Sequence, residues 1–206
     1  MADGQVPSFK VDTAFDGAKT VLYQFEAIEV WTTFHKAPRA RITILESDGF
    51  PAANSGDFAI TAPITISFGY GGDLNMVFTG IVAFKRIEID PAQGSRLVVQ
   101  AYGGEAPRFG GLKSLPAPVL TLEAGNNIVA LADETAKNDV LGAKPLTAGT
   151  VTYVGSTVAE AGNTISLSGL GMLFDATVLV LGVHHVFRDG RWLTTATFGA
   201  PPEPAS

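Results

Sequence analysis

A strand–turn–strand pattern occurs twice in this chain, and the repeat constrains what the chain can fold into. Each copy has an apolar strand, a glycine-containing turn, a long apolar strand and a closing strand. The copies span Pro63–Gly103 and Asn163–Gly199. The strings Thr65-Ile66-Ser67 and Thr164-Ile165-Ser166 match, as do the closing pairs Tyr102-Gly103 and Phe198-Gly199. Two related β units in one short chain indicate a duplicated barrel.

The composition fits a large buried core and excludes several kinds of site. The chain has 206 residues, of which 46% are hydrophobic and 17% charged. Its net charge of −6 argues against a nucleic-acid-binding surface, because such domains are usually basic. The absence of cysteine excludes disulfides, thiolate zinc sites and cysteine nucleophiles. The sequence has no secretory signal at residues 1–10 and no apolar run long enough for a membrane helix. We therefore expect a chain made in the cytoplasm that inserts into no membrane.

The pattern along the chain predicts an all-β fold of two tandem tube-like β-barrel domains with one short helix. We expect alternating strands at residues 20–34, 39–45, 63–68, 76–90, 96–101, 119–122, 127–131, 150–154, 163–167, 176–187 and 191–198. The strand over 76–90 is expected to bend near Thr79-Gly80. Asp189-Gly190 is typical of a hairpin turn, and Asn54 lies in a predicted turn cluster.

The helix is predicted over residues 133–141, where Asp133 is placed as a cap and Gly142 as a stop. The domain boundaries follow from composition: glycines and prolines cluster between the two copies, which indicates a linker. The expected organisation is an extended N-terminal arm (1–18), a first barrel (19–103), a linker (104–118), a second barrel (119–200) and a flexible tail (201–206).

Residues that could carry chemistry lack the spacing that chemistry needs. His184 and His185 are adjacent in an apolar strand, so they point to opposite faces and cannot chelate one metal; His35 is far away in sequence. Loop carboxylates form no calcium-binding string, and the glycine cluster 69–72 lacks the lysine and helix of a phosphate loop. We expect no catalytic, cofactor-binding or metal-binding residues and no enzymatic activity. The carboxylates considered are Glu46, Asp48, Asp57 and Asp73.

The aromatic residues favour a structural interpretation in the same way. Most lie within strands or at turns and are expected in the barrel core: Phe68, Phe78, Phe84 and Phe174. Trp31 and Trp192 flank strands, where a sugar-binding platform is an alternative.

The motifs together resemble the contractile-tail baseplate hub family, which includes the phage late control D protein, phage baseplate hubs and the hub part of type VI secretion spike proteins (VgrG). The first half carries the resemblance in residues 41–49, Phe58, 64–70 and 77–82. The second half carries it in residues 162–171, 180–185 and 189–194, with Gly155 and Phe174. Typical members have a long insertion between the barrels where this chain has only residues 104–149, and Asp175-Ala176 departs from a common glycine.

The resemblance implies a structural role without chemistry. Such a hub is a homotrimer in which six similar barrels form a ring, and this ring joins a hexameric tail tube to a trimeric spike. The expected partners are the tube ring, a separate spike protein and the end of the tape-measure protein, in a virion or injection-particle baseplate. DNA or cargo would pass the channel without specific binding, and we hypothesise that acidic residues facing the channel repel DNA phosphates.

Three alternatives stay open from the sequence. One is a six-fold tail tube or tube-initiator protein with a single barrel per chain, against which the duplicated motif argues. Another is a monomeric ligand-binding β-barrel or sandwich, in which Trp31, Trp192 and Tyr70 line a pocket. The third is a cell-wall hydrolase at the tail tip.

Overall fold

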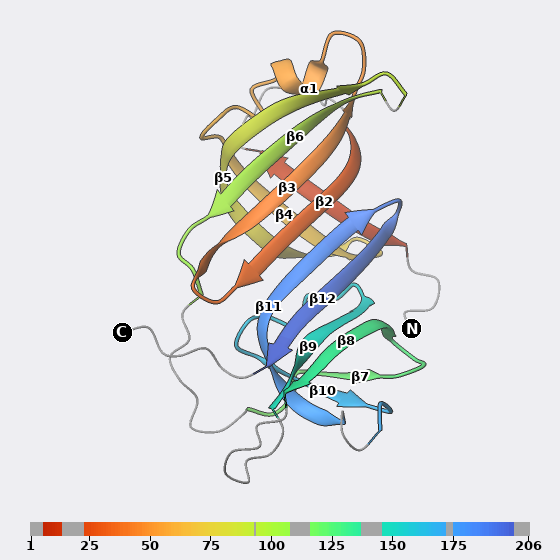
Figure 1. Ribbon diagram of the computed structural model, residues 1–206. Helices are drawn as coiled ribbons and strands as arrows, with labels where there is room; N and C mark the ends of the chain where they lie inside the picture. Colours follow the sequence, from red (N-terminus) through yellow and green to blue (C-terminus); the bar gives the residue numbers. More distant parts are fainter. Residues whose placement is uncertain are drawn as a thin grey trace.

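The computed structural model describes residues 6–13, 23–92, 94–107, 116–136, 146–171 and 175–199. The fold is nearly all β, as the sequence predicts, with a short helix α1 at Pro51–Asn54 (Figure 1). The strands are β1 (Pro7–Thr13), β2 (Gln24–Thr33), β3 (Lys36–Glu46), β4 (Pro63–Tyr70), β5 (Asp73–Asp90), β6 (Gly94–Gly103), β7 (Leu120–Glu123), β8 (Ile128–Ala136), β9 (Leu146–Val154), β10 (Thr164–Ser168), β11 (Ala176–Arg188) and β12 (Arg191–Gly199).

One 12-stranded sheet runs through the whole molecule in the order β1-β4-β5-β6-β3-β2-β11-β12-β9-β8, and β10 pairs with both β11 and β7. We call β1–β6 the first lobe and β7–β12 the second lobe. In Figure 1 the strands from β6 to β8 form one diagonal row, and β1 and β4 lie behind β2 and β3. The sheet therefore curves around the first lobe and continues without a break into the second.

The predicted helix over residues 133–141 is wrong for the part that the structure describes. Residues 133–136 are the end of strand β8 and pair antiparallel with β9, while residues 137–141 lie outside the described residues. A charged edge strand resembles a capped helix start in sequence, because strands at the edge of a sheet often carry charges. The ladder to β9 decides the conformation, since tertiary pairing overrides local propensity.

Among the described residues, the helix is α1, which lies where the sequence predicts a turn cluster at Asn54. Pro51 lies in its first turn, where its missing N–H costs nothing. The Glu46 carboxylate accepts hydrogen bonds from the backbone N–H groups of Ala52 (3.2 Å) and Ala53 (2.7 Å), so it caps the helix from β3. A negative charge there also favours the helix N-terminus.

The segment expected as an extended N-terminal arm contains strand β1, which pairs antiparallel with β4 from Pro7 opposite Tyr70 to Thr13 opposite Ile64. The bend expected near Thr79-Gly80 lies between two irregularities in β5. Val77 has no partner in the β4–β5 ladder, and Ala83 has none in the β5–β6 ladder. β5 changes partner between them: its first half pairs with β4 and its second half with β6. A β-bulge bends a strand, which allows this change.

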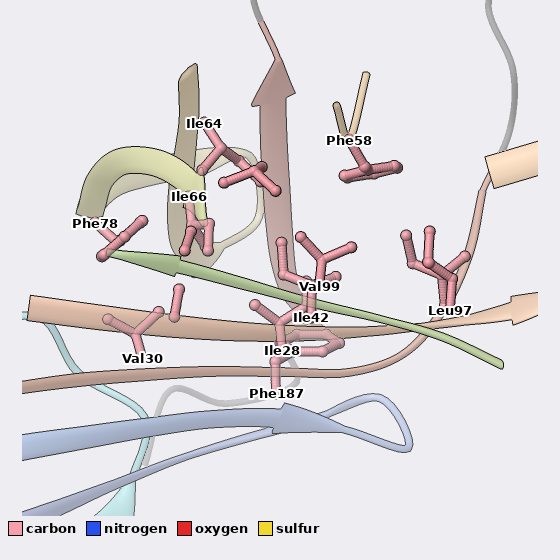
Figure 2. Packing of buried hydrophobic residues seen from close by; sticks show 14 of the residues in the cluster. Ile28, Val30, Ile42, Phe58, Ile64, Ile66, Phe78, Leu97, Val99 and Phe187 are labelled. Carbon is pink, nitrogen blue, oxygen red and sulfur yellow. The ribbon is translucent and has the colours of Figure 1, made fainter. Parts of the chain in front are cut away.

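Two main clusters of buried apolar side chains lie along the sheet, one in each lobe. The first cluster contains Ile28, Ile42, Ile66, Phe68 and Leu97 among others, and the second contains Leu122, Val151, Tyr153, Ile165 and Phe198 among others. The first cluster also contains Phe187 and Trp192, which belong to the second half of the chain. Figure 2 shows Phe187 beside Ile28 in this cluster.

Candidate assembly surface

The two lobes share one order of strands, which the sequence repeat only partly reveals. The first lobe runs β4-β5-β6-β3-β2, and the second runs β10-β11-β12-β9-β8. Every neighbouring pair within these two runs is antiparallel. The duplication therefore covers β2 and β3 as well, although their sequences show no evident match to β8 and β9.

Irregularities in the ladders occur at matching places in the two lobes. The β2–β3 ladder skips one residue between Phe25 and Ala27, and the β8–β9 ladder skips one between Ile128 and Ala130. The β5–β6 ladder skips the residue after Val82, and the β11–β12 ladder skips the residue after Val180. Bulges are specific features of a strand pair, so their coincidence supports a structural duplication.

A pair of hydrogen bonds fixes the correspondence between the lobes. Val82 accepts a bond from the N–H of Thr61 (2.8 Å) and donates to the carbonyl of Ala62 (2.9 Å). Val180 likewise accepts from Gly162 (2.9 Å) and donates to Asn163 (2.9 Å). Thr61 and Gly162 also share a left-handed backbone, with φ of 71° and 101°. Val82 therefore corresponds to Val180.

The matching sequence strings are offset by two residues from the structural correspondence that the strand ladders define. Ile64 pairs with Gly80 two residues before Val82, and Ile165 pairs with Val178 two residues before Val180. Ile64 thus corresponds to Ile165, and Ile66 to Leu167; all four side chains are buried. A shift of two residues keeps every side chain on its own face of a strand, so the sequence match still identifies the core-facing positions.

The lobes are joined by an antiparallel ladder between β11 and β2, which runs from Gly182 opposite Thr33 to Arg188 opposite Ala27. Beyond this ladder the β11–β12 hairpin extends over the first core. The ring of Phe187 lies 6.1 Å from that of Phe68, and the Trp192 ring lies 5.5 Å from Phe68. The end of the hairpin in one lobe thus completes the core of its neighbour.

Among the residues that the structure describes, the equivalent β5–β6 hairpin of the first lobe has no such neighbour. By the same correspondence, Ile87 occupies the position of His185 and Ile89 that of Phe187. Ile87 is 46% exposed and Ile89 is 70% exposed, whereas Phe187 is 9% exposed. An apolar hairpin end is therefore buried in one lobe and uncovered in the other.

The face of the sheet opposite the cores carries a stack of three side chains at the junction. The Trp31 ring lies parallel to the His184 ring at 4.5 Å, and the Arg39 guanidinium lies 4.6 Å from the Trp31 centroid. His184 Nε2 is 3.6 Å from a Glu29 carboxylate oxygen, and this neighbour lowers the pKa of Glu29. Charges of both signs share this face, where Glu26 and Arg96 also form an ion pair (2.5 Å).

The structure confirms that His184 and His185 point to opposite faces. His184 lies on the face with Trp31, while His185 is buried between the lobes, where its Nδ1 lies 3.0 Å from Thr194 Oγ1. Burial lowers the pKa of His185 to about 4, and the neighbouring His184 adds to the effect. His185 is therefore neutral at pH 7 and lends the hairpin a polar contact with Thr194.

Two of the four loop carboxylates considered in the sequence, Asp57 and Glu46, have hydrogen-bond partners in the structure. Asp57 accepts hydrogen bonds from the Tyr23 hydroxyl (2.5 Å) and from Thr13 Oγ1 (3.0 Å). Burial, together with this bond to Asp57, raises the pKa of Tyr23 to about 12. Glu46 caps α1, as described above. Within the described ranges, no group of three or more histidine and carboxylate side chains is close enough to hold a metal ion.

The three residues of the ligand-pocket alternative do not share one site, because only two of them lie together. Trp192 lies in the first core with its ring 5.3 Å from Tyr70, whereas Trp31 lies on the opposite face of the sheet beside His184. Gly71 and Gly72, both with positive φ, form the turn between β4 and β5. A groove of about 710 Å³ does lie between the lobes, lined among others by Met76, Glu105, Glu160, Val183 and His185.

Among the described residues, no helix has the length and apolar character needed to cross a membrane.

The outcome for the aromatic residues differs from one to the next. Phe174, expected in the core, lies outside the described residues. Phe68 and Phe78 are buried as expected, but Phe84 is 45% exposed, on the second half of β5. The sequence expectation for Phe84 is therefore wrong, because this side chain belongs to neither of the two main clusters of buried apolar residues.

Comparisons with known proteins identify the fold. A family model described as the Alg8 N-terminal domain matches residues 5–105. No curated protein matches this sequence. A tail protein from Neisseria meningitidis has a TM-score of 0.63 at 10% identity, covering 95% of this chain and 97% of its own. The 43 kDa tail protein of prophage MuSo2 from Shewanella oneidensis has a TM-score of 0.59 at 10% identity, covering 94% and 96%.

A third solved structure extends the similarity to a secretion system. An Escherichia coli type VI secretion component, described as structurally similar to T4 phage tail proteins gp27 and gp5, has a TM-score of 0.60 at 12% identity. The match covers 94% of this chain and 77% of that one. These likenesses span both lobes, so the chain as a whole has the fold seen in phage tail proteins and in this secretion component.

Proposed function

We propose that this protein is the structural hub of a contractile or phage-like tail baseplate. Three copies form a ring of six similar lobes, which seats the hexameric tail tube on one side and a trimeric spike on the other. In this proposal each copy contributes the two barrels expected at residues 19–103 and 119–200. The protein performs no chemistry, and its location is the baseplate of a virion or injection particle.

The observation that carries this proposal is the junction between β2 and β11. Two lobes of one topology are joined side by side into a continuous sheet. A contact that joins one repeat to the next can be repeated between chains, and such head-to-tail contacts close into rings when the rotation allows. Similar folds in tail proteins support the same role.

A ring built this way would turn the open face of the sheet toward its channel, because the two cores occupy the other side. This face carries Glu26 and Glu29 together with Arg39, Arg96 and Arg188. A face of mixed charge would bind DNA weakly, because phosphate binding requires clustered basic residues. We therefore propose passage of DNA or cargo without specific binding, in place of a uniformly acidic channel.

The test is the absolute mass of the purified full-length chain by light scattering over a range of concentrations, alone and with the spike protein of the same particle. The hub function predicts a trimer of about 65 kDa, three times the 21.5 kDa chain, alone or with the spike. A hexamer would favour a tube ring instead. A monomer at every concentration that ignores the spike would contradict both and would justify ligand screens.

A further inference from the structure

We propose that the groove between the lobes is a docking site for an arginine side chain, which an extended segment of a partner protein carries. His185 and two carboxylates accept its hydrogen bonds, and apolar residues pack against its stem. The groove lies on the core side of the sheet, so in the proposed ring it opens on the outer wall, away from the channel. This placement rests on the proposed function, whereas the binding chemistry is argued from the groove alone.

A buried imidazole gives the groove its first acceptor. His185 lines the groove, although only 7% of this residue is exposed. Its Nδ1 lies 3.0 Å from the Thr194 hydroxyl, which already donates to the Ser156 carbonyl (3.3 Å) and therefore accepts from Nδ1–H. In a neutral imidazole the other nitrogen is then an acceptor. The Nε2 of His185 thus offers a lone pair for which the described residues provide no donor.

Two exposed carboxylates line the same groove, Glu105 after β6 and Glu160 before β10. No lysine or arginine lines it among the residues that the structure describes. An ionised carboxylate accepts hydrogen bonds and donates none. The charged and titratable groups of the groove, with Nε2 of His185, are therefore all acceptors. Such a surface is complementary to a cation that carries several N–H donors.

Apolar side chains from both lobes also line the groove. Phe78 and Val183 are buried, while Met76 is 63% exposed and open to a ligand. Arginine has an apolar methylene stem below its guanidinium group, so one side chain can use both kinds of surface. A guanidinium is also more weakly hydrated than an ammonium group, which favours arginine over lysine at an interface.

The size of the groove indicates that more than one side chain enters it. Its volume of about 710 Å³ lies in the range of sites that enclose a whole small ligand, about 300–1,000 Å³. One arginine side chain fills only part of this space, so neighbouring residues of the same segment fill the rest. Asn75 and Thr157 also line the groove and have side-chain groups that can bond the backbone of such a segment.

The probe for this site is a short peptide, acetylated and amidated, with a central arginine between leucines. The control peptide has citrulline in place of arginine, which keeps the shape and the N–H donors but removes the charge. NMR of the His185 ring nitrogens follows the titration of the full-length protein, and the His185→Gln variant assigns the signals. The arginine peptide should change the Nε2 chemical shift to saturation. It should bind about fivefold more tightly than the citrulline peptide, because exposed ion pairs contribute modestly.

Two double variants separate the groove from a general attraction to an acidic protein. Glu105→Gln/Glu160→Gln removes both groove carboxylates and should weaken binding of the arginine peptide about fivefold, with little effect on the citrulline peptide. Asp48→Asn/Asp189→Asn is the matched control, because it removes two charges that do not line the groove. It should leave binding unchanged. All four carboxylates belong to exposed residues, so both variants should fold.

Several results would overturn the inference. Equal affinity for the two peptides would do so, as would equal weakening by the two double variants or binding that leaves the Nε2 chemical shift unchanged. A groove that a second copy or another part of this chain already fills would bind no peptide, which would also overturn it.

The mass of the protein separates this inference from the hub function. A trimer that binds neither peptide overturns the docking site and leaves the hub function standing. A protein that stays monomeric, with or without the spike, but binds the arginine peptide at His185 supports the docking site and contradicts the hub function.

Discussion

The ring of Phe187 meets the ring of Phe9 edge-on, with centroids 4.7 Å apart. These residues come from nearly opposite ends of the chain, from the hairpin of the second lobe and the first strand of the first. Edge-to-face aromatic pairs add about 1 kcal/mol beyond the area that they bury. The contact therefore binds the second lobe to the first core, and it makes the two lobes one cooperative structure.

Replacement of Phe187 by alanine should lower the free energy of unfolding by about 3–4 kcal/mol, the usual cost of removing a buried phenylalanine. The loss should affect the first lobe although Phe187 belongs to the second. Denaturant unfolding followed by tryptophan fluorescence measures it, because Trp192 lies in the same cluster. Phe84→Ala, at a 45% exposed position, is the control. In the isolated chain this control should cost less than about 1 kcal/mol, and equal losses would contradict the account.

Replacement of Gly155 by alanine should destabilise the protein by about 1–3 kcal/mol through overpacking. A Cβ at Gly155 would lie 2.0 Å from Trp192 Cδ2, and the Gly155 carbonyl also accepts the Tyr70 hydroxyl bond (3.2 Å). The thermal unfolding midpoint is the measurement. Gly104→Ala is the matched control, since a Cβ there meets nothing within 4 Å. A midpoint for Gly155→Ala as high as that of the control would argue against close packing at Trp192.

Stability should fall as the pH drops from about 6.5 to about 4, with His185 as the cause. The folded-state pKa of His185 is lowered to about 4 by burial, from an ordinary value of 6.5. The unfolded chain therefore binds a proton in this range that the folded chain does not, which favours unfolding. The free energy of unfolding should be lower by about 3 kcal/mol below pH 4 than at pH 7 because of His185.

The measurement is the free energy of unfolding at several pH values for the parent and for His185→Gln. In His185→Gln, the free energy of unfolding should no longer fall between pH 6.5 and 5. Glu26 and Glu29, whose pKa values are lowered, stay ionised in this range. If the free energy of unfolding falls with pH equally in the two proteins, buried, neutral His185 is not the cause of the pH dependence.

Replacement of Thr61 by glycine should raise the free energy of unfolding by about 1 kcal/mol. A β-branched residue at a φ of 71° is strained, and relief of such strain is worth about 1–3 kcal/mol less the entropy cost of glycine. The counterpart in the second lobe is already glycine, Gly162, with a φ of 101°. Gly162→Thr should therefore be destabilising. Chemical denaturation of both variants tests the correspondence, and a change of the same sign in both would count against it.

The strands could be predicted from sequence because their alternation is local. The hairpin at Asp189-Gly190 is a good example, since both residues have the positive φ that this turn type needs (52° and 68°). The helix prediction failed at residues 133–136 because the charges of an edge strand resemble a helix cap. No local pattern distinguishes the two when the partner strand is distant in sequence.

The site was harder to predict than the strands. The repeat could be found from matching strings, but the sequence does not say that Phe187 and Trp192 bury in the other lobe while Ile87 and Ile89 stay exposed. A signal was present: each hairpin ends in alternate apolar residues where a free hairpin would be polar. Which neighbour covers an apolar strand end depends on the order of strands in the sheet, and this order becomes visible only in three dimensions.

Electron microscopy of the purified full-length protein tests the central claim most directly. End-on class averages should show a closed ring with strong six-fold rotational power and a weaker three-fold component, because two similar lobes from each of three copies alternate around it. The ring should have a central channel lined by the open sheet face. Averages that show isolated two-lobed particles at all concentrations, with or without the spike protein, would contradict the account.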